Sequence, residues 1–377
     1  MSSDLATAMK TPTIWRRIPF RRAVGAYLLV RLATLVFVIV DDRLRHTGLV
    51  DHLSIWDGEW FLQAVAHGWP SHLPMANGHV AANTAAFFPV LALVMRALAA
   101  VTGLSAAVVG LWVSALTGLS ALIAIGYLAR EFAGHEKAER AALLFAVAPG
   151  AFIFNLIYAE GILLTCVSLG LLALMRRKWV VAGVLGAVAS ATSPVGMVFV
   201  AACALTVLLA VVREREWKSL WALALSPVGF VTWMAYLWVH TGTLMAWRLT
   251  ERGGWRSYPS LAYPVHILTQ FLFNPASPTM TGQILFFGTV VSILGVVVIC
   301  KEHQPTPVLA YGIFSVVFFA VSAPVGLRPR FVMLAFPLVI GAATRWSGWR
   351  YRLILILSMM LLALMTIEEM SSFAVFP

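Results

Sequence analysis

Apolar runs long enough to cross a bilayer recur along this sequence, and they limit the possible folds more than any other feature. A helix needs about 20 apolar residues to cross the hydrocarbon core. Only 11% of the residues are charged, whereas a soluble domain carries about 25%. So little charge cannot cover a globule of 377 residues with a hydrated surface. The sequence therefore predicts an all-α, polytopic transmembrane helical bundle of about ten crossings, with residues 1–377 forming a single integral membrane domain.

The basic residues gather at the ends of these apolar runs, as they do at the cytoplasmic ends of membrane helices. The formal net charge of +11 is therefore interpreted as a topology signal, and no nucleic-acid partner is expected. Residues 1–22 are expected to form a basic cytoplasmic tail, which places the first long loop, 41–86, outside. A second long outer loop is expected at 241–282. The excess of arginine over lysine favours a multi-pass protein of a bacterial plasma membrane.

The number of crossings in this topology is inconsistent. Counting from residue 41 outside to the basic residues 176–178 inside leaves one crossing too many or too few. Segment 141–158 contains Pro149-Gly150, and irregular backbone of this kind is tolerated in a membrane where protein or water covers it. We therefore interpret 141–158 as a broken, partly re-entrant segment, and we expect it to account for the inconsistency.

The first outer loop concentrates the polar residues, with five acids and five of the nine histidines between residues 41 and 86. Trp56, Trp60 and Phe61 belong to a helical spacing of aromatic residues, which predicts a short amphipathic helix in the membrane interface. Asp57 in this helix is either an interfacial acid of an aromatic belt or a base in a sheltered cleft. Other acids that compete for the role are Asp41, Asp42 and Glu59.

The sequence indicates neither a metal site nor a disulfide. The outer histidines are irregularly spaced and form no HxxxH or HxH pattern of the kind that binds metals. The three cysteines, Cys166, Cys203 and Cys300, all lie in apolar runs. No metal and no cofactor are therefore expected.

Charged residues embedded in apolar sequence are costly in a membrane, and by default they are functional candidates. Glu160 has apolar sequence on both sides, and it either stabilises the start of the following helix through the helix dipole or takes part in function. Arg328 and Arg330 flank a proline in the last outer turn, where they either bind an anion through the guanidinium fork or snorkel to the interface. Arg31 and Arg96 lie within apolar runs, and each is expected to pair with Glu160 or another acid.

Several motifs, taken in chain order, resemble those of the PIG-V-like mannosyltransferases, which are integral membrane glycosyltransferases of the type C fold. The matching segments are WDGEWF (56–61), HGW (67–69), FFP (87–89) with Arg96, APG (148–150), YAEG (158–161), SATSPVG (190–196), RPRF (328–331) and AFP (335–337). The resemblance covers most of the chain. One departure is Ser193, because the family usually has arginine between this threonine and proline. The chain is also short for the class.

The resemblance implies a sugar donor carried on a polyprenyl phosphate, usually with mannose, and a lipid or lipid-glycan acceptor among the membrane lipids. It implies inverting transfer on the outer face with Asp57 as the base. Glu160 would orient Asp57 or a sugar hydroxyl, while Arg328 and Arg330 would clamp the lipid phosphate. This chemistry demands no metal, because the phosphate already leaves as a stable anion. Further substrate contacts are expected from Trp56, Glu59, Trp60, Asp42 and Tyr158.

Two other functions stay open at this point. A lipid or solute transporter or flippase would need internal repeats and charges near the midplane, whereas the polar residues gather here in two outer loops. A non-catalytic subunit that kept the fold would be consistent with Ser193. Transfer of labelled sugar in membranes, compared between the wild type and Asp57→Ala, separates both from an enzyme.

Overall fold

The described residues of the computed structural model are 18–45, 48–273 and 279–372, and most of them are helical. Residues 1–17 of the expected basic tail, His46 in the first outer loop and 274–278 in the second lie outside the described residues. Within the described ranges, the strands form two short antiparallel pairs, β1 (Met75–Ala76) with β2 (His79–Val80) and β3 (Tyr258–Pro259) with β4 (Ser322–Ala323). The expected all-α bundle is confirmed.

Six helical segments of the described chain are long and apolar enough to cross a membrane. They are α2 (Arg21–Arg45), α6 (Ala106–Ala133), α10 (Gly196–Glu214), α11 (Leu220–Leu225) joined to α12 (Val228–Thr241), α15 (Met280–Lys301) and α19 (Gly348–Ile367). The shorter apolar helices are α5 (Pro89–Thr102), α8 (Glu160–Met175), α9 (Trp179–Thr192) and α16 (Thr306–Ala320). Because length and composition alone do not fix which of these span a bilayer, the figure of about ten crossings stays a prediction.

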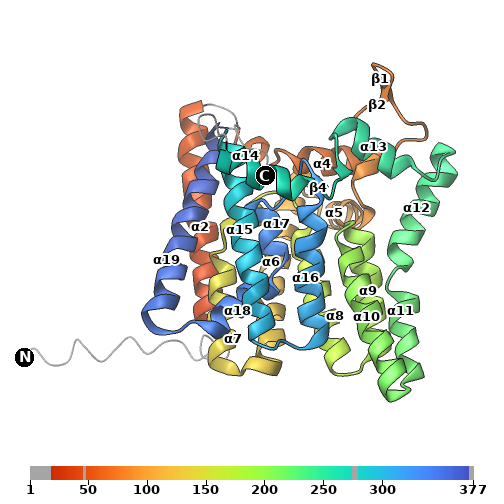
Figure 1. Ribbon diagram of the computed structural model, residues 1–377. Helices are drawn as coiled ribbons and strands as arrows, with labels where there is room; N and C mark the ends of the chain where they lie inside the picture. Colours follow the sequence, from red (N-terminus) through yellow and green to blue (C-terminus); the bar gives the residue numbers. More distant parts are fainter. Residues whose placement is uncertain (1–17, 46–47, 274–278, 373–377) are drawn as a thin grey trace, which may run out of the picture.

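The remaining helical elements are short, and many of them lie at the two ends of the bundle (Figure 1). They are α3 (Leu49–His52), α4 (Asp57–His67), η1 (Thr84–Ala86), α7 (His135–Ala146), η2 (Pro149–Asn155), η3 (Trp217–Ser219), α13 (Ala246–Gly254), α14 (Tyr263–Phe273), α17 (Pro329–Leu334), α18 (Pro337–Arg345) and η4 (Glu368–Ser372). We call the end that carries α4, α13 and α14 the α4 end, and the opposite end, which carries α7, the α7 end.

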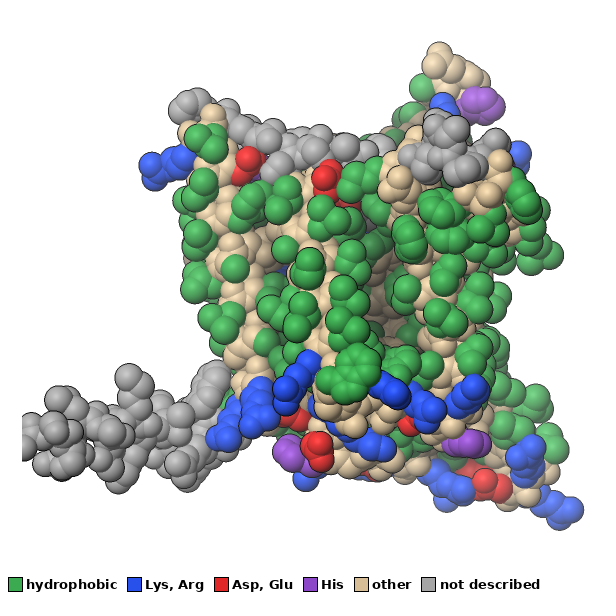
Figure 2. Space-filling model, turned by 60° about the vertical axis from the view of Figure 1, so that its left-hand side comes forward, with side chains coloured by type: hydrophobic (Ala, Val, Ile, Leu, Met, Phe, Trp, Pro, Cys, Tyr) green, Lys and Arg blue, Asp and Glu red, His purple; other side chains and the backbone are tan. Residues whose placement is uncertain are grey.

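An apolar belt surrounds the bundle between its two ends. Figure 2 shows hydrophobic side chains over the middle of the molecule and a concentration of Lys and Arg side chains at the α7 end. Leu29 on α2 and Leu294 on α15 are 68% and 60% exposed, although both lie within long apolar helices. Water cannot solvate so many exposed apolar side chains favourably, and lipid can. The chain is therefore a membrane protein.

The helix α5 lies against α4. Trp60 of α4 stacks on Phe87, just before α5, with ring centroids 5.9 Å apart. Arg96, midway along α5, donates hydrogen bonds to two carbonyl groups in the second half of α4. The long helix α6 starts soon after α5 and carries the chain to the α7 end (Figure 1). The run 87–101, which the sequence count took as a crossing, thus forms a helix of 14 residues that packs on α4, and the number of crossings stays a prediction.

The segment around Pro149-Gly150 is broken, as its sequence predicted. The axes of α7 and η2 meet at a bend of 68°. Most residues of η2 are buried, and a Cβ added to Gly150 would lie 2.6 Å from the carbonyl oxygen of Pro329. Only glycine allows the backbones of η2 and α17 to approach this closely. The break thus brings the chain back through the core towards the α4 end and in contact with α17.

Candidate functional site

One arginine joins the two acids that the sequence singled out most strongly. The Nη2 atom of Arg330 lies 2.7 Å from Oδ2 of Asp57, and its Nε lies 2.5 Å from Oε1 of Glu160. The exposed fractions of these side chains are 14% for Arg330, 27% for Asp57 and 7% for Glu160. The guanidinium also lies 4.4 Å from the ring centre of Tyr158. We call Asp57, Glu160 and Arg330 the carboxylate cluster.

Asp57 is fixed at the start of α4 by the backbone on both sides of it. Trp56 precedes the helix with φ of 60°, a conformation that is uncommon for a bulky residue and tends to occur at functional sites. Gly58 follows, and a Cβ there would lie 3.3 Å from Ile157. Because the first turn of a helix stabilises negative charge, α4 favours an ionised carboxylate at Asp57.

Glu160 is held by tight packing between α8 and α6. Ser114 of α6 accepts a hydrogen bond from Tyr158 N at 2.9 Å and donates one to Tyr158 O at 3.0 Å. A Cβ added to Gly161 would lie 2.3 Å from Oγ1 of Thr117. These contacts fix the chain on both sides of Glu160, the first residue of α8, whose positive helix end favours a carboxylate.

Arg330 enters the cluster from the first turn of α17. Pro329 is the first residue of that helix, a position that suits proline because its missing N–H would have no partner there. The close approach of Gly150 to the backbone at 329–330 holds this turn against the core. One planar guanidinium can then bind two carboxylates through separate N–H groups. The cluster carries one positive and two negative groups, so its formal charge is negative when both acids are ionised.

Among the residues that the structure describes, Arg31 and Arg96 form no ion pair with an acid, so our expectation that they would is wrong for this part of the chain. Arg31 Nη1 donates to Ala151 O at 2.5 Å, and its guanidinium lies 5.0 Å from the ring centre of Tyr27. Arg96 donates to Val65 O at 2.7 Å. Carbonyl oxygens can satisfy guanidinium donors as well as carboxylates do, so sequence alone did not reveal the partners.

The aromatic residues expected to contact substrate line the region around the cluster. Tyr158 is 1% exposed and lies under Arg330. Trp60 stacks on Phe87 and meets Trp255 of the second outer loop edge-on, with centroids 5.3 Å apart. Because these rings come from both outer loops, they join the two loops into one surface at the α4 end.

The remaining predicted residues lie at several places on the α4 end. Glu59 is exposed on α4. Asp42, in the last turn of α2, accepts a hydrogen bond from Gly48 N at 2.5 Å. Arg328 is partly buried immediately before α17, and this burial lowers its pKa, although Tyr263 and Glu369 act in the opposite direction. Asp42 and Glu59 therefore have local surroundings that differ from those of the carboxylate cluster.

Glu251 is a further acid at this end that the sequence pattern did not single out. It lies on α13, and Trp255, the residue that follows this helix, packs on Trp60. Burial, together with the negative charge of Asp57, raises the pKa of Glu251 to about 7. Glu251 thus shares the electrostatic environment of Asp57. A signal for it was present, since Glu251, like Asp57, is an acid framed by tryptophans in an outer loop.

Glu369 is a second acid that the sequence did not indicate. It lies in η4 after the last long helix and is 2% exposed. Its charge acts on Arg328 and Arg330, so η4 packs close to the last outer turn. An acid that follows an apolar run is expected to be solvated at the end of the helix, and nothing in the local sequence predicts that Glu369 is buried.

Within the described ranges, no group of three or more His, Cys, Asp or Glu side chains is arranged to hold a metal ion. The carboxylate cluster contains only two acids, and an arginine occupies the space between them. The cluster is therefore built for charge pairing and hydrogen bonding.

The fold is shared with two solved membrane glycosyltransferases of the type C fold. One is ArnT from Cupriavidus metallidurans bound to undecaprenyl phosphate, with a TM-score of 0.53 and 17% identity over 88% of this chain and 62% of ArnT. The other is the apo oligosaccharyltransferase of Archaeoglobus fulgidus, with a TM-score of 0.51 and 14% identity over 89% of this chain and 56% of that one. At these identities the likeness shows the fold alone.

This chain spans less than two thirds of the length of either solved structure. No family model matches its sequence. No curated protein matches it significantly either.

Proposed function

We propose that the protein is a glycosyltransferase that moves a sugar from a polyprenyl-phosphate carrier to a lipid or lipid-glycan acceptor. The observation that carries this proposal is the carboxylate cluster, in which Arg330 holds Asp57 and Glu160 at one end of the bundle. The fold supports it, because ArnT has this fold and its structure contains undecaprenyl phosphate. A lipid-linked donor is also the class of substrate that a membrane-embedded bundle can admit from the bilayer.

In the proposed reaction Asp57 is the base. The acceptor hydroxyl gives its proton to the Asp57 carboxylate while its oxygen forms a bond to the anomeric carbon. The bond between that carbon and the phosphate oxygen breaks on the opposite side, so the configuration inverts and the lipid phosphate leaves with the bonding electrons. Asp57 is the most exposed side chain of the cluster, at 27%, which suits a group that must reach a substrate.

The structure suggests different tasks for the two arginines of the last outer turn. Arg330 uses Nε and Nη2 on the two carboxylates, so we assign it to positioning Asp57 and Glu160. Holding a base in one orientation contributes to rate by removing unproductive geometries. Arg328, two residues away, is assigned to the phosphate of the donor, where a guanidinium stabilises the charge that grows as the phosphate leaves.

The sugar is proposed to be mannose, on the strength of the PIG-V-like motifs. Segments of four of these motifs meet in space. Gly58 packs on Ile157, just before YAEG, and Gly150 of APG packs on the backbone of RPRF. Asp57, Glu160 and Arg330 come from three of the same motifs. Because the motifs converge on one cluster, their order along the chain is consistent with one shared site.

The α4 end is proposed to face outward from a bacterial plasma membrane. Lys and Arg side chains gather at the α7 end (Figure 2), and positive residues mark the cytoplasmic ends of membrane helices. The carboxylate cluster lies near α4, at the opposite end. This orientation agrees with the one expected from the sequence, and it places the reaction on the outer face.

Transfer of radiolabelled mannose from polyprenyl-phosphate mannose in membranes containing the full-length protein tests the proposal. Asp57→Asn keeps the shape of the side chain but cannot accept the proton, so the rate should fall by about 100-fold or more. Glu136→Gln removes an exposed acid from α7, at the opposite end of the bundle; it is the control and should transfer at the wild-type rate. Equal transfer by wild type and Asp57→Asn, at equal expression, would exclude Asp57 as the base. No transfer by the wild type would favour a non-catalytic or transport role instead.

A further inference from the structure

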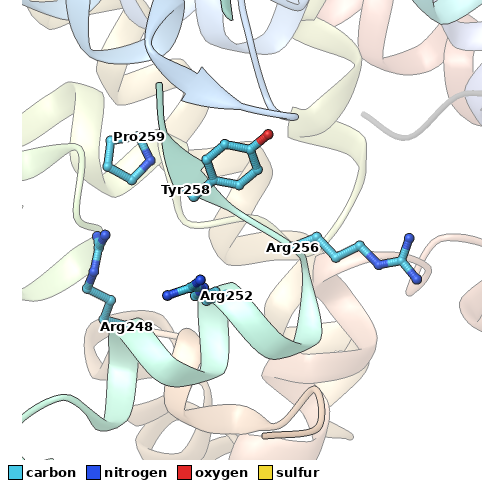
Figure 3. A pocket seen from close by; sticks show the side chains of 5 residues that line it. All are labelled: Arg248, Arg252, Arg256, Tyr258 and Pro259. Atoms are coloured by element: carbon cyan, nitrogen blue, oxygen red, sulfur yellow. The ribbon is translucent and has the colours of Figure 1, made fainter. Parts of the chain in front are cut away.

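A pocket beside α13 is lined by three arginines. Arg248, Arg252 and Arg256 line it together with Tyr258 and Pro259, and its volume is about 490 Å³. Figure 3 shows the side chains of Arg248 and Arg252 on the same side of α13, below Pro259, while Arg256 extends away from them. A volume of this size lies within the usual range for small-molecule sites, about 300–1,000 Å³.

The arginines of this pocket are not matched by acids of the described chain. All three are exposed, and the ion pairs of the described residues involve other arginines. Like charges four residues apart, as in Arg248 and Arg252, destabilise a helix slightly. Positive residues are also disfavoured at the outer ends of membrane proteins. The concentration of guanidinium groups at this end therefore calls for an anion from outside the chain.

The helix α13, which carries the pocket arginines, is held in place by close packing. A Cβ added to Gly253 would lie 2.1 Å from Val80 O, so α13 packs tightly on β2. Asn83 Nδ2 donates to Oγ1 of Thr250 at 3.1 Å, and Trp255 packs on Trp60. Such contacts fix the position of the helix, so a bound anion would not have to order it. This lowers the entropic cost of binding.

Both α13 and the β3–β4 pair link the pocket to the carboxylate cluster. Glu251 lies on α13 as well, and the negative charge of Asp57 contributes to its raised pKa. Tyr258 of β3 pairs with Ala323 of β4, and β4 leads into the turn that carries Arg328 and Arg330. A ligand anchored in the pocket would therefore lie next to the site of transfer and separate from Arg328.

We propose that this pocket binds the phosphate group of an anionic phospholipid headgroup, and that this lipid is the acceptor. The proposal rests on the function proposed above for the identity of the lipid as acceptor. A guanidinium pair offers forked donors for the oxygens of a phosphodiester, and the amphipathic helix α13 lies at the end of the bundle, where lipid headgroups would lie. Binding of the phosphate would hold the headgroup hydroxyls near Asp57 while the donor phosphate occupies Arg328.

Lipid binding is the first test. Detergent-purified full-length protein is titrated with dioleoylphosphatidylglycerol, with dioleoylphosphatidylcholine and with inorganic phosphate, and binding is followed by the rise in melting temperature. The anionic lipid should stabilise the wild type more than phosphatidylcholine does. The double variant Arg248→Gln/Arg252→Gln should weaken this apparent affinity by about tenfold. The control Arg350→Gln/Arg352→Gln removes the same charge from exposed positions on α19 and should bind as the wild type does.

The outcomes of this titration separate the possible ligands. If inorganic phosphate stabilises the wild type as strongly as the anionic lipid, the pocket is a site for free phosphate, and the proposal is overturned. If the two double variants lose affinity equally, the effect is one of overall charge, and the proposal is also overturned. Selective loss in Arg248→Gln/Arg252→Gln supports a site for the headgroup.

Kinetics then test whether the bound lipid is the acceptor. In the transfer assay Arg248→Gln/Arg252→Gln should raise the KM for an anionic lipid acceptor by about tenfold, with little change in the KM for the donor. An unchanged acceptor KM would overturn the acceptor role. If the wild type transfers no sugar, the proposed function fails, whereas the lipid titration still reports on the pocket itself.

Discussion

The α4 end contains arginines in two contrasting settings. Arg330 is 14% exposed and binds two carboxylates, whereas Arg248 and Arg252 are exposed and line an open pocket. The first arginine is neutralised within the protein, so its charge serves to position other groups. The second set keeps its charge available to a ligand. Partners and burial, rather than residue type, therefore decide whether an arginine positions other groups of a site or binds a substrate.

Removal of Arg330 should have the largest effect. In Arg330→Ala, Asp57 and Glu160 lose the cation between them, and breaking a buried ion pair in this way costs about 3–5 kcal/mol. We expect a large fall in melting temperature and loss of sugar transfer. Arg330→Lys, which keeps the charge but cannot bind both acids through a fork, should recover part of the stability and little of the transfer. Melting temperature and transfer of labelled sugar measure both effects, and wild-type transfer by Arg330→Ala would contradict the positioning role.

Displacement of Arg330 without loss of its charge should have the next largest effect. A Cβ in Gly150→Ala would lie 2.6 Å from Pro329 O, so η2 and α17 must move apart, at a cost of about 1–3 kcal/mol. Transfer should fall although every charged group remains. Gly282→Ala is the control, because its Cβ would approach only Oγ1 of Thr279, at 3.4 Å. If the two variants transfer equally well, this backbone contact does not position Arg330.

Glu251 lies on the same helix as the pocket arginines, and it should make stability depend on pH. Its pKa of about 7 in the folded protein is above the ordinary value of 4.5. Between these values the folded state binds more protons than the unfolded state, so stability falls as pH rises and levels off above about pH 7. Glu251→Gln should remove this slope and be more stable by about 1–2 kcal/mol above pH 7, allowing for partial exposure.

Melting temperatures of Glu251→Gln between about pH 5 and pH 8 check this expectation. Glu59→Gln, which removes an exposed carboxyl group from α4, provides the control for the loss of one negative charge. An equal slope in the wild type and Glu251→Gln would show that Glu251 titrates in its ordinary range.

The smallest effect on stability is expected at the pocket. Arg248→Gln removes an exposed charge and relieves its repulsion from Arg252, so the free energy of unfolding should change by less than about 0.5 kcal/mol. The loss of stability should therefore be much smaller in Arg248→Gln than in Arg330→Ala. If Arg248→Gln in purified protein without added lipid destabilises as strongly as Arg330→Ala does, Arg248 is a structural residue, and its assignment to ligand binding fails.

Local sequence predicted the helices well because each apolar run satisfies its own backbone hydrogen bonds. The packing of α5 was not predicted: the run 87–101 was taken as a crossing from its apolar character, and in the structure it packs on α4. Hydropathy measures transfer to an apolar environment, and burial against another helix provides that environment as well as lipid does. The broken segment at Pro149-Gly150 was predictable because proline and glycine disrupt helices directly.

The candidate site was predictable only in part. Asp57, Glu160 and Arg330 stood out because charge in apolar or aromatic surroundings is costly. Their contact with one another, and the neutral partners of Arg31, depend on segments far apart in sequence. Glu369 was missed for the same reason, since its burial arises only in the folded chain.

The sequence by itself determined that this is a helical membrane protein and which charges are costly enough to need a purpose. Both follow from the free energy of placing residues in an apolar environment, which each segment carries with it. Only the tertiary structure decided that one guanidinium holds two of the acids, that Glu251 shares their field, and that three other arginines line an open pocket. Coulombic and hydrogen-bond energies depend on distances between side chains, and close packing of the helices sets those distances.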